Sequence, residues 1–442
     1  MKSAIDRTHD IKLRSFIKTA NDGVTDFPIQ NLPLGIFSRH STEAGPGVAI
    51  GDQIFDLRAA HRLGLLPPDV PGDAIEQNSL NALFALGRGA LTRLRHALSA
   101  LLSDAESSAP VRRHAVDLLV PMSDCRLYRP TNVGNYTDFY AGIYHAKAAG
   151  ALLTPENPLP PNYKWVPIAY HGRASSVQIG GDDVRRPLGQ LPPVQPGDSP
   201  GFGPCKRLDF ELELGFYVTG GNALSESIPV KNAAGHIAGY SLLNDWSARD
   251  IQRWEMFPLG PFLSKSFATS VSPWVVTADA LAPFRVPAME RPAGEPGPLG
   301  YLLDADDQAS GGLDINLRVL LSTERMRREG DLPAEILRSN ARYLYWTTAQ
   351  MVAHHTINGC NLCAGDLIGT GTISGPSDTE LGSMLELTAA GSRPITLPNG
   401  QIRGFLEDGD EITFRGRCQR EGFASIGFGH CTGAIRAPHE RQ

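Results

Sequence analysis

The chain has 442 residues, and its 41 Lys plus Arg against 47 Asp plus Glu give a formal charge of −6. This length predicts two or three domains, and 41% apolar with 20% charged residues excludes wholesale disorder. The mildly acidic composition gives nucleic acid and anionic lipid no bulk electrostatic attraction. No apolar run approaches the roughly 18 residues of a membrane span, no signal-peptide core is recognisable, and 6 cysteines are too few for a disulfide framework. We therefore expect a reduced, cytoplasmic protein.

The first part of the chain predicts short strands followed by helices. Glycines and prolines break residues 15–57 into short apolar runs, which are typical of short strands. Apolar residues then recur at helical spacing over 79–104, which predicts one or two amphipathic helices. After Pro121 the composition changes to aromatic, acidic and turn-rich segments. We therefore place a domain boundary near 118–122.

The rest of the chain is expected to be mainly β, with a few helices. Two stretches rich in proline and glycine, 187–204 and 282–300, predict irregular loops. A helix is predicted from about Pro333 to His355, because proline suits the first helical turn. Further on, the turn dipeptides at 399–400 and 408–409 indicate hairpins.

The segment Leu208–Leu214 alternates strictly between apolar and acidic residues. As a strand it would put Asp209, Glu211 and Glu213 on one face, about 6.5 to 7 Å apart. Carboxylates at this spacing repel unless water or a cation lies between them, and a hard divalent cation is the natural partner. A solvated strand face explains the same pattern, so both interpretations stay open.

Residues 244–252 would bring an acid, a cation and an amide onto one short element. Ser247 and Asp250 match a capping box, which predicts a helix that begins at Ser247 with Asp245 just before it. Arg249 and Gln252, three residues apart, would share a face of that helix. A surface ion pair with a helix cap is the alternative interpretation.

Three further features bear on chemistry. If 137–150 is helical, Asp138 and His145 lie on the same face, which suits a histidine base beside a metal site. The alternative interpretation is that His145 is an ordinary packing or surface residue. Lys265 lies in an apolar stretch, where partial burial would be costly without a partner. The glycine-rich run 369–375 lacks the lysine of a P-loop and the third glycine of a dinucleotide fingerprint, so nucleotide binding is not expected.

Together these motifs resemble the fumarylacetoacetate hydrolase family over essentially the whole chain. The segments that carry the resemblance, in family order, are 26–29, 31–33, 136–140, 170–176, 208–213, 244–252, 258–262, 265–267, 371–376 and 383–387. The resemblance implies a mainly β (α+β) fold and a homodimer. Residues 1–120 would form an SH3-like β-barrel domain with amphipathic helices, and residues 121–442 a catalytic mixed β-sandwich roll.

The resemblance also implies a role for each polar residue described above. The implied ligands of a calcium or magnesium ion are Asp138, Glu211, Glu213 and Asp245, with Asp209 outside the set. Thr269 and the Lys265 segment match a second, structural cation site. His145 matches the general base and Glu386 its orienting carboxylate. The groups that match holders of the developing oxyanion are Arg249, Gln252 and Lys265. The residues that match substrate contacts are Tyr140, Tyr170 and Thr372, together with Arg249 and Gln252.

The implied reaction is hydrolysis of a carbon–carbon bond in a dicarboxylate β-diketo acid, at the end of tyrosine and phenylalanine catabolism. A water activated by the histidine would attack a carbonyl, and the metal would take up charge. One alternative is an acylpyruvate hydrolase, decarboxylase or isomerase of the same superfamily. Another, of a different class, is a non-catalytic calcium-binding dimer.

The sequence departs from the family pattern at the rim of the implied pocket. No arginine follows His145 before Arg173, Met256 stands where a tyrosine is usual, and Ala268 replaces a glycine. A dianionic substrate would lose a charge-assisted contact there. We expect a lysine to replace it, Lys164 rather than Lys147.

Overall fold

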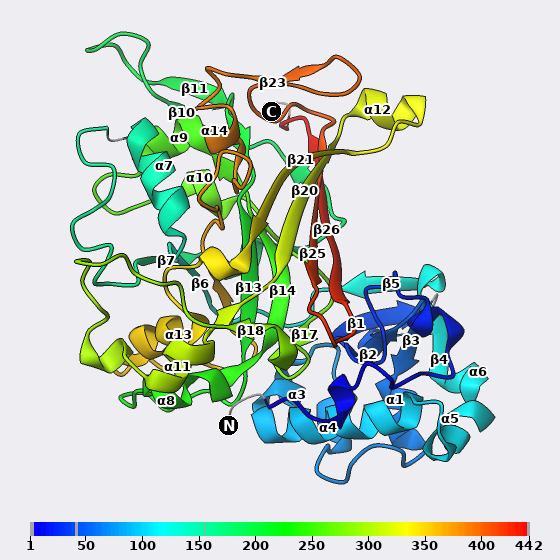
Figure 1. Ribbon diagram of the computed structural model, residues 1–442. Coiled ribbons are helices and arrows are strands. Elements are labelled where there is room, and N and C mark those ends of the chain that lie inside the picture. The colour runs from blue at the N-terminus through cyan, green and yellow to red at the C-terminus, as the bar shows by residue number, and fades with distance from the viewer. Residues whose placement is uncertain (1–3, 40–42, 154, 440–442) are drawn as a thin grey trace.

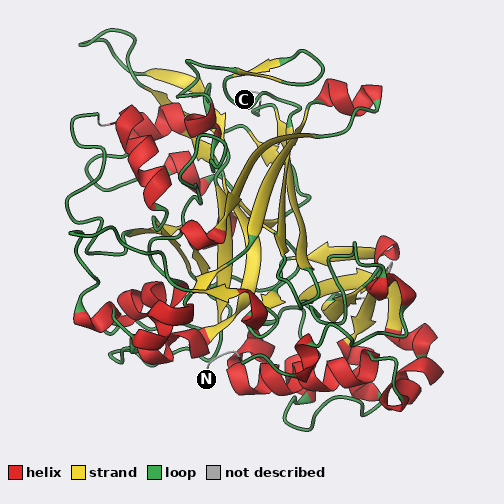
Figure 2. Cartoon of the chain, viewed as in Figure 1, coloured by secondary structure: helices red, strands yellow, loops and turns green. Residues whose placement is uncertain are grey.

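The computed structural model describes residues 4–39, 43–153 and 155–439, and it is mainly β (Figure 1). Long strands run through the middle of the larger part, and helices lie around its periphery and along the smaller part (Figure 2). Among the described helices, none combines the length and the apolar character needed to cross a bilayer.

The N-terminal part is built on a five-stranded antiparallel sheet in the order β4-β3-β2-β1-β5. Its strands are β1 (Leu34–Arg39), β2 (Gly45–Ile50), β3 (Gln53–Asp56), β4 (Leu119–Pro121) and β5 (Cys125–Tyr128). Its helices are α1 (Leu57–Arg62), α2 (Gly72–Ile75), α3 (Asn81–Ala85), α4 (Arg88–Leu102), α5 (Ala109–Arg113) and α6 (Ala115–Leu118). The helices predicted over 79–104 are thus confirmed, and the apolar face of α4 is buried in the same core as the sheet.

Two further sheets, one of eight strands and one of five, form the centre of the rest of the molecule, and their facing side chains make one core. The eight-stranded sheet contains β6 (Tyr136–Phe139), β7 (Ala169–Gly172), β8 (Val177–Ile179), β13 (Leu212–Val218), β14 (Ile237–Asp245), β16 (Thr269–Val271), β17 (Val276–Thr277) and β22 (Leu367–Gly369). The second, five-stranded sheet contains β9 (Val184–Arg185), β20 (Asn316–Ser322), β21 (Ala334–Asn340), β25 (Glu411–Cys418) and β26 (Ile426–Arg436). Edge-to-face contact of Phe210 with Phe414 is one link in that core.

Short hairpins and helices complete this part of the chain. The two-stranded pairs are β10 (Leu188–Leu191) with β11 (Gly201–Pro204), β12 (Leu208–Asp209) with β15 (Ser247–Ala248), β18 (Arg285–Val286) with β19 (Gly312–Leu313), and β23 (Ile395–Thr396) with β24 (Ile402–Arg403). The helices are α7 (Ile143–Leu153), α8 (Val230–Ala233), α9 (Arg249–Glu255), α10 (Leu263–Ser266), α11 (Ala305–Ser310), α12 (Glu324–Glu329), α13 (Thr348–Thr356) and α14 (Met384–Leu387). The hairpin predicted at 399–400 is confirmed, and 187–204, expected to be irregular, contains β10 and β11.

The helix predicted from Pro333 to His355 is wrong over its first half. Residues 334–340 form β21, because pairing with β20 satisfies their backbone groups and buries Leu337 against the core. The helix begins only at α13. There the Thr347 hydroxyl accepts from Gln350 N (3.1 Å) and the Gln350 side chain accepts from Thr347 N (2.9 Å), a capping box the sequence analysis missed.

Candidate metal and active site

The order of the eight-stranded sheet brings three distant acids together. Strand β22 lies between β6 and β13, and β13 pairs with β14. Asp138 lies opposite Gly369 of β22, Gly369 lies opposite Gly215 of β13, and Asp245 ends β14. Asp138 is therefore on a strand, and the expectation that a helix aligns it with His145 is wrong, because pairing with β22 and β7 extends the chain there.

Asp138, Glu213 and Asp245, which we call the acidic triad, offer carboxylate oxygens that lie within 4.8 Å of one another. Their side chains are 2%, 0% and 0% exposed. Burial raises the pKa of all three, and the charges of the neighbouring carboxylates raise those of Asp138 and Glu213 further. Three buried acids this close are stable only if a proton or a cation offsets their charge.

The residues fit a divalent cation with oxygen ligands. Within the described part of the chain, Glu213 Oε1 and Asp245 Oδ1 are buried without a hydrogen-bond partner. A Cβ on Gly369 would lie 2.4 Å from Asp138 Oδ1 and 3.1 Å from Glu213 Oε2, so only glycine leaves room between these two acids. Carboxylate oxygens without hydrogen-bond partners, such as Glu213 Oε1 and Asp245 Oδ1, are the ligands that calcium or magnesium prefers.

Glu211 lies beside the triad but is held by two cations. Its carboxylate accepts from Lys265 Nζ at 2.6 Å and pairs with Arg249 Nη1 at 2.7 Å. Burial raises the pKa of Glu211, but the charges of Lys265 and Arg249 outweigh that effect and hold it low. Lys265 Nζ also donates to Asp245 Oδ2 at 2.6 Å, so this ammonium joins Glu211 to the triad. The buried lysine has the partners that its environment requires.

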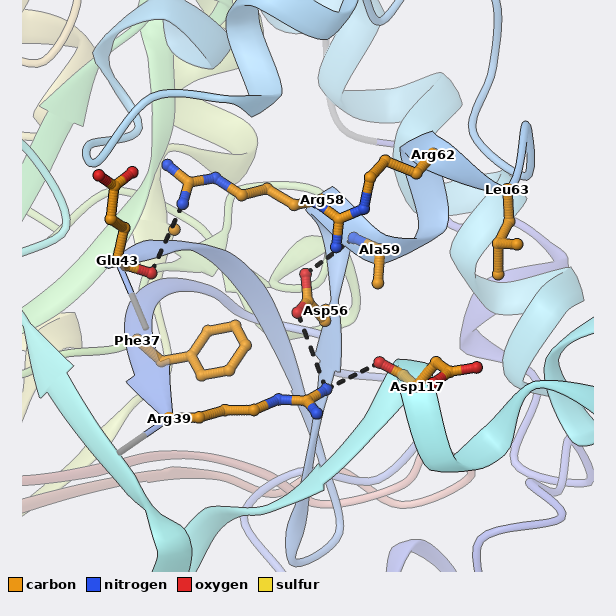
Figure 3. A pocket seen from close by; sticks show the side chains of 10 residues that line it. Phe37, Arg39, Glu43, Asp56, Arg58, Ala59, Arg62, Leu63 and Asp117 are labelled. Carbon is orange, nitrogen blue, oxygen red and sulfur yellow. Dashed lines mark hydrogen bonds and ion pairs between the residues drawn. The ribbon is translucent and has the colours of Figure 1, made fainter. Parts of the chain in front are cut away.

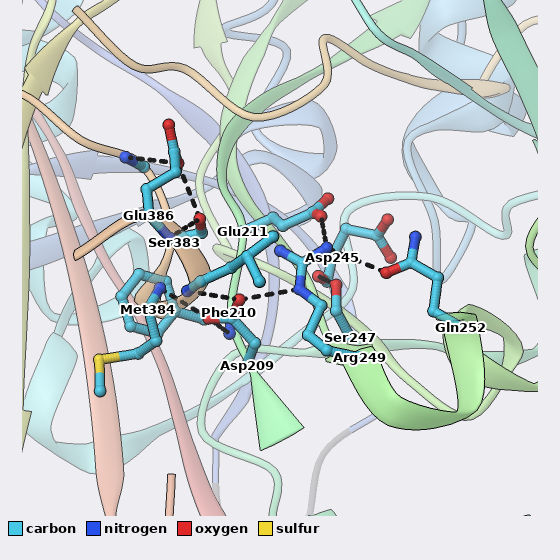
Figure 4. Close-up of polar contacts among 12 residues, drawn as sticks. Asp209, Phe210, Glu211, Asp245, Ser247, Arg249, Gln252, Ser383, Met384 and Glu386 are labelled. Carbon is cyan, nitrogen blue, oxygen red and sulfur yellow. Dashed lines mark hydrogen bonds and ion pairs between the residues drawn. The ribbon is translucent and has the colours of Figure 1, made fainter. Parts of the chain in front are cut away.

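Figure 4 shows the polar groups around Arg249. Arg249 is the first residue of α9, and its Nη1 donates to Gln252 Oε1 at 3.1 Å, so the two share a face of the helix as predicted. The predicted helix start at Ser247 is wrong: Ser247 lies in β15, and its hydroxyl donates to the Asp245 carbonyl. Asp250 forms no capping box, because Cys205 and Lys206 donate to its carboxylate.

His145 is buried near the start of α7, and its Nδ1 lies 2.8 Å from Glu386 Oε2. Burial raises the pKa of Glu386, but His145 and two serine hydroxyls outweigh that effect and lower it. Those hydroxyls belong to Ser374 and Ser383, which donate to the Glu386 carboxylate at 2.8 and 2.7 Å. Sequence reasoning missed both serines, although Ser383-x-x-Glu386 matches a capping box that could have indicated one of them.

The expected substrate contacts lie around these groups. The Tyr140 ring meets that of His145 edge to face, with centroids 5.8 Å apart, and the Tyr170 hydroxyl donates to Asp245 Oδ2 at 2.8 Å. The Thr372 hydroxyl is buried without a partner among the described residues. Thr269 is buried on β16, opposite Asp245 of β14 in the register. Tyr136, which the sequence analysis gave no role, donates to Asp138 Oδ2 at 3.1 Å.

The lysine expected to replace the missing rim arginine is engaged elsewhere. Lys164 Nζ donates to Glu295 Oε1 at 2.6 Å, and Lys147 is exposed on α7. Glu295 lies in the segment 282–300, where the guanidinium of Arg291 covers the Tyr345 ring at 4.2 Å. The ion pair with Glu295 counts against Lys164 as a substrate contact, and the role of Lys147 stays a prediction.

A separate cavity of about 550 Å³ lies in the N-terminal part and contains three arginines, Arg39, Arg58 and Arg62 (Figure 3). Arg39 donates to the Asp117 carbonyl, and Arg58 donates to backbone carbonyls of 76–77. Asp56, Asp117 and Glu43 balance the charge of the cavity. It therefore lacks the concentration of catalytic groups that marks the site around His145.

Comparisons with known proteins concern the chain as a whole. Two family models match, "Fumarylacetoacetase N-terminal" over residues 30–130 and "Fumarylacetoacetate (FAA) hydrolase C-terminal" over residues 135–436. The chain is 47% identical over 431 residues to the fumarylacetoacetase of Bos taurus, covering 95% of this chain and 98% of that protein. It is 48% identical over 432 residues to that of Arabidopsis thaliana, covering 96% and 98%. With both models matched in order and relatives aligned along nearly their whole length, this chain belongs to the fumarylacetoacetate hydrolase family.

Proposed function

We propose that this protein hydrolyses 4-fumarylacetoacetate to fumarate and acetoacetate. The contact of His145 Nδ1 with Glu386 Oε2 carries the proposal, since it supplies an oriented base within the same buried polar cluster as Arg249 and Lys265. The names and the nearly full-length alignment of the relatives supply the substrate. A non-catalytic calcium-binding protein would have no use for that oriented histidine.

The proposed cofactor is a magnesium or calcium ion held by the acidic triad, with Glu211 as the fourth ligand that the family resemblance implies. When bound, it would act as a Lewis acid that stabilises negative charge on substrate oxygens. The unpartnered oxygens of Glu213 and Asp245 support this assignment. Thr269 and the Lys265 segment are the proposed second, structural cation site.

In the proposed mechanism, Glu386 holds the Nδ1–H of His145, so that the other ring nitrogen, Nε2, takes a proton from water. The water oxygen bonds to the carbonyl carbon next to the fumaryl double bond. The carbonyl oxygen becomes an alkoxide near Arg249, Gln252 and Lys265. The bond from that carbon to the neighbouring methylene then breaks, and the electron pair leaves as the enolate of acetoacetate. His145 returns its proton to that enolate, so the sum is one water consumed and two acids released.

Two free donors support the assignment of the oxyanion group. Arg249 Nη2 is buried and has no hydrogen-bond partner among the residues that the structure describes. The Lys265 ammonium has three protons, and the contacts with Glu211 and Asp245 use two of them. Tyr140, Tyr170 and Thr372 are proposed to hold the rest of the substrate.

A second candidate is hydrolysis of a shorter acylpyruvate. The ion pair of Lys164 with Glu295 favours it, because that pair occupies the lysine expected to meet a second substrate carboxylate. Steady-state kinetics with fumarylacetoacetate and a panel of acylpyruvates distinguish the two. The first proposal expects the highest kcat/KM with fumarylacetoacetate. A preference for monoanionic substrates would overturn it.

The family resemblance also leads us to propose an SH3-like barrel, a homodimer and a cytoplasmic enzyme. The antiparallel order of the five-stranded sheet supports the first of these. Phe257, Leu259 and Phe262 are largely exposed in the segment that joins α9 to α10, and this apolar surface supports a dimer interface.

A further inference from the structure

Asp209 is a buried carboxylate outside both the acidic triad and the His145–Glu386 pair. Its side chain is 0% exposed at the end of β12. Strict alternation would place it with Glu211 and Glu213, but the strand is interrupted between β12 and β13. Its hydrogen bonds run instead to α9 and to α14 (Figure 4).

On one side, Asp209 fixes the guanidinium of Arg249. Asp209 Oδ2 accepts from Arg249 Nε at 2.8 Å, and Glu211 Oε1 lies 2.7 Å from Arg249 Nη1. These two contacts set the plane of the guanidinium fork. The remaining guanidinium nitrogen, Nη2, has no partner among the described residues, and we expect it to donate to the alkoxide in the proposed mechanism.

On the other side, Asp209 binds the segment that carries Glu386. Asp209 Oδ1 accepts from Met384 N at 2.7 Å, and Oδ2 accepts from Leu385 N at 3.0 Å. The residue after these two amides is Glu386, whose Oε2 lies 2.8 Å from His145 Nδ1. The same carboxylate thus contacts both Arg249, the proposed oxyanion donor, and the segment that carries Glu386, the partner of the proposed base.

We propose that Asp209 is a positioning residue that holds Arg249 and the Glu386 segment in one rigid frame. This inference rests on the proposed function, which assigns Arg249 and Glu386 their roles. With Phe210 N at 2.8 Å from Oδ1, the carboxylate accepts four hydrogen bonds, which use its four lone-pair sites. It has no acceptor capacity left for a metal ion, substrate or solvent, so its effect on the reaction is indirect.

Asp209→Asn is the diagnostic variant. An amide has only one oxygen, so its NH₂ group must face either Arg249 and Leu385 or the amides of Phe210 and Met384, all of which are donors. One side of the frame is then released. Because misplacement of about 1 Å can reduce turnover by about 10²-fold, we expect kcat to fall by about that factor. We expect KM and the affinity for Mg²⁺ to change less than threefold, since the four hydrogen bonds of Asp209 involve neither Tyr140, Tyr170 and Thr372 nor the acidic triad.

Asp410→Asn is the matched control. Asp410 is 1% exposed, accepts from Arg403 Nε and Nη2 at 2.8 and 2.9 Å, and also accepts from the Glu407 amide. It therefore has the same chemistry as Asp209 but no contact with the site. The control should lose comparable stability and keep its kcat. Equal stability loss in both variants with wild-type kcat in Asp209→Asn would overturn the proposal.

A double-mutant cycle tests whether Asp209 acts through Arg249. In the background of Arg249→Ala, the effect of Asp209→Asn on kcat should shrink at least threefold, because one of its two targets is gone. Effects that multiply fully would contradict the coupling. If Asp209→Asn does not fold, Asp209→Glu keeps the charge but displaces it by a methylene. We expect a similar fall in kcat, and wild-type kcat in that folded variant would overturn the proposal.

The proton NMR signal of His145 Nδ1–H gives a readout that needs no turnover. It should shift or broaden in Asp209→Asn and stay in place in Asp410→Asn. An unchanged signal in Asp209→Asn would contradict the link through α14. If the wild-type protein fails to hydrolyse fumarylacetoacetate, the proposed function fails, whereas this signal still tests the positioning role by itself.

Discussion

Replacing Lys265 by methionine should destabilise the folded protein strongly. The Lys265 ammonium lies 2.6 Å from both Glu211 Oε2 and Asp245 Oδ2, and its side chain is only 5% exposed. Methionine fills nearly the same space but leaves Asp245 without its cation and Glu211 with Arg249 alone. Removal of one partner from a buried ion pair costs about 3–5 kcal/mol, because the remaining charge stays buried.

The penalty should be smaller at acidic pH and grow as the pH rises. Burial lowers the pKa of Lys265, but Asp245 and Glu211 outweigh it and raise the pKa above its ordinary value of 10.5. The Lys265 contribution is therefore lost only as the pH rises through that raised pKa. Glu211 has a lowered pKa, so its contribution is lost as the pH falls below its ordinary value of 4.5. Burial already raises the pKa of Asp245, and loss of the Lys265 ammonium would raise it further, so the folded variant becomes less stable as rising pH removes the proton from that carboxyl.

Urea unfolding of the metal-free protein at pH 7 measures this penalty, with Lys164→Met as the matched control. The Lys164 ammonium also lies 2.6 Å from a carboxylate, that of Glu295. However, its side chain is 28% exposed, and it contacts neither Glu211 nor the acidic triad. This half-buried pair is closer to surface ion pairs, which contribute about 0–1 kcal/mol, than the nearly fully buried contacts of Lys265 are. If Lys265→Met cost no more than Lys164→Met, the reasoning from burial and charge would be refuted.

Three further predictions concern catalysis and the metal. Glu386→Gln should lower kcat by about 10²-fold or more, which is within the range of a positioned base, while the Mg²⁺ affinity measured by calorimetry stays unchanged. An equal loss of metal binding would contradict the assignment of His145 as a base rather than a metal ligand. The affinity for Mg²⁺ should rise with pH, because the raised pKa values of the triad carboxyls mean that binding must displace protons. Calorimetry in two buffers of different ionisation enthalpy should detect this proton release, and an affinity that does not change with pH would contradict the prediction. Lys164→Ala should leave KM within about threefold, because Glu295 holds that ammonium, and an increase of tenfold or more in steady-state assays would restore Lys164 as a substrate contact.

The sequence predicts the residue types of the site better than their geometry. The alternation in Leu208–Leu214 predicts one continuous strand, but the strand is broken between Asp209 and Glu213. The pattern misses this break because both faces of the segment are buried, so polar residues do not indicate a solvent-facing side. The position of Asp138 depends on pairing of β6 with β22, more than 200 residues later in the chain. Local periodicity carries no information about such a contact.

Competing partners explain the local errors. Ser247 and Asp250 have the spacing of a capping box, but Asp250 is taken by Cys205 and Lys206, residues that no local pattern brings near. In the same way, the preference of 334–340 for a helix yields to pairing with β20. By contrast, α3 and α4 follow from the sequence, since the spacing of their leucines already defines the buried face.

The claim that a metal ion and a histidine-activated water together hydrolyse fumarylacetoacetate is tested most directly by metal depletion. The fall of the diketone absorbance would be followed with the depleted protein, and again after Mg²⁺ or Ca²⁺ is restored. Since Lewis-acid stabilisation is worth several kcal/mol, we predict a loss of at least about 10²-fold on depletion and full recovery with one of the two ions. Undiminished hydrolysis by protein shown to be free of metal would contradict the account.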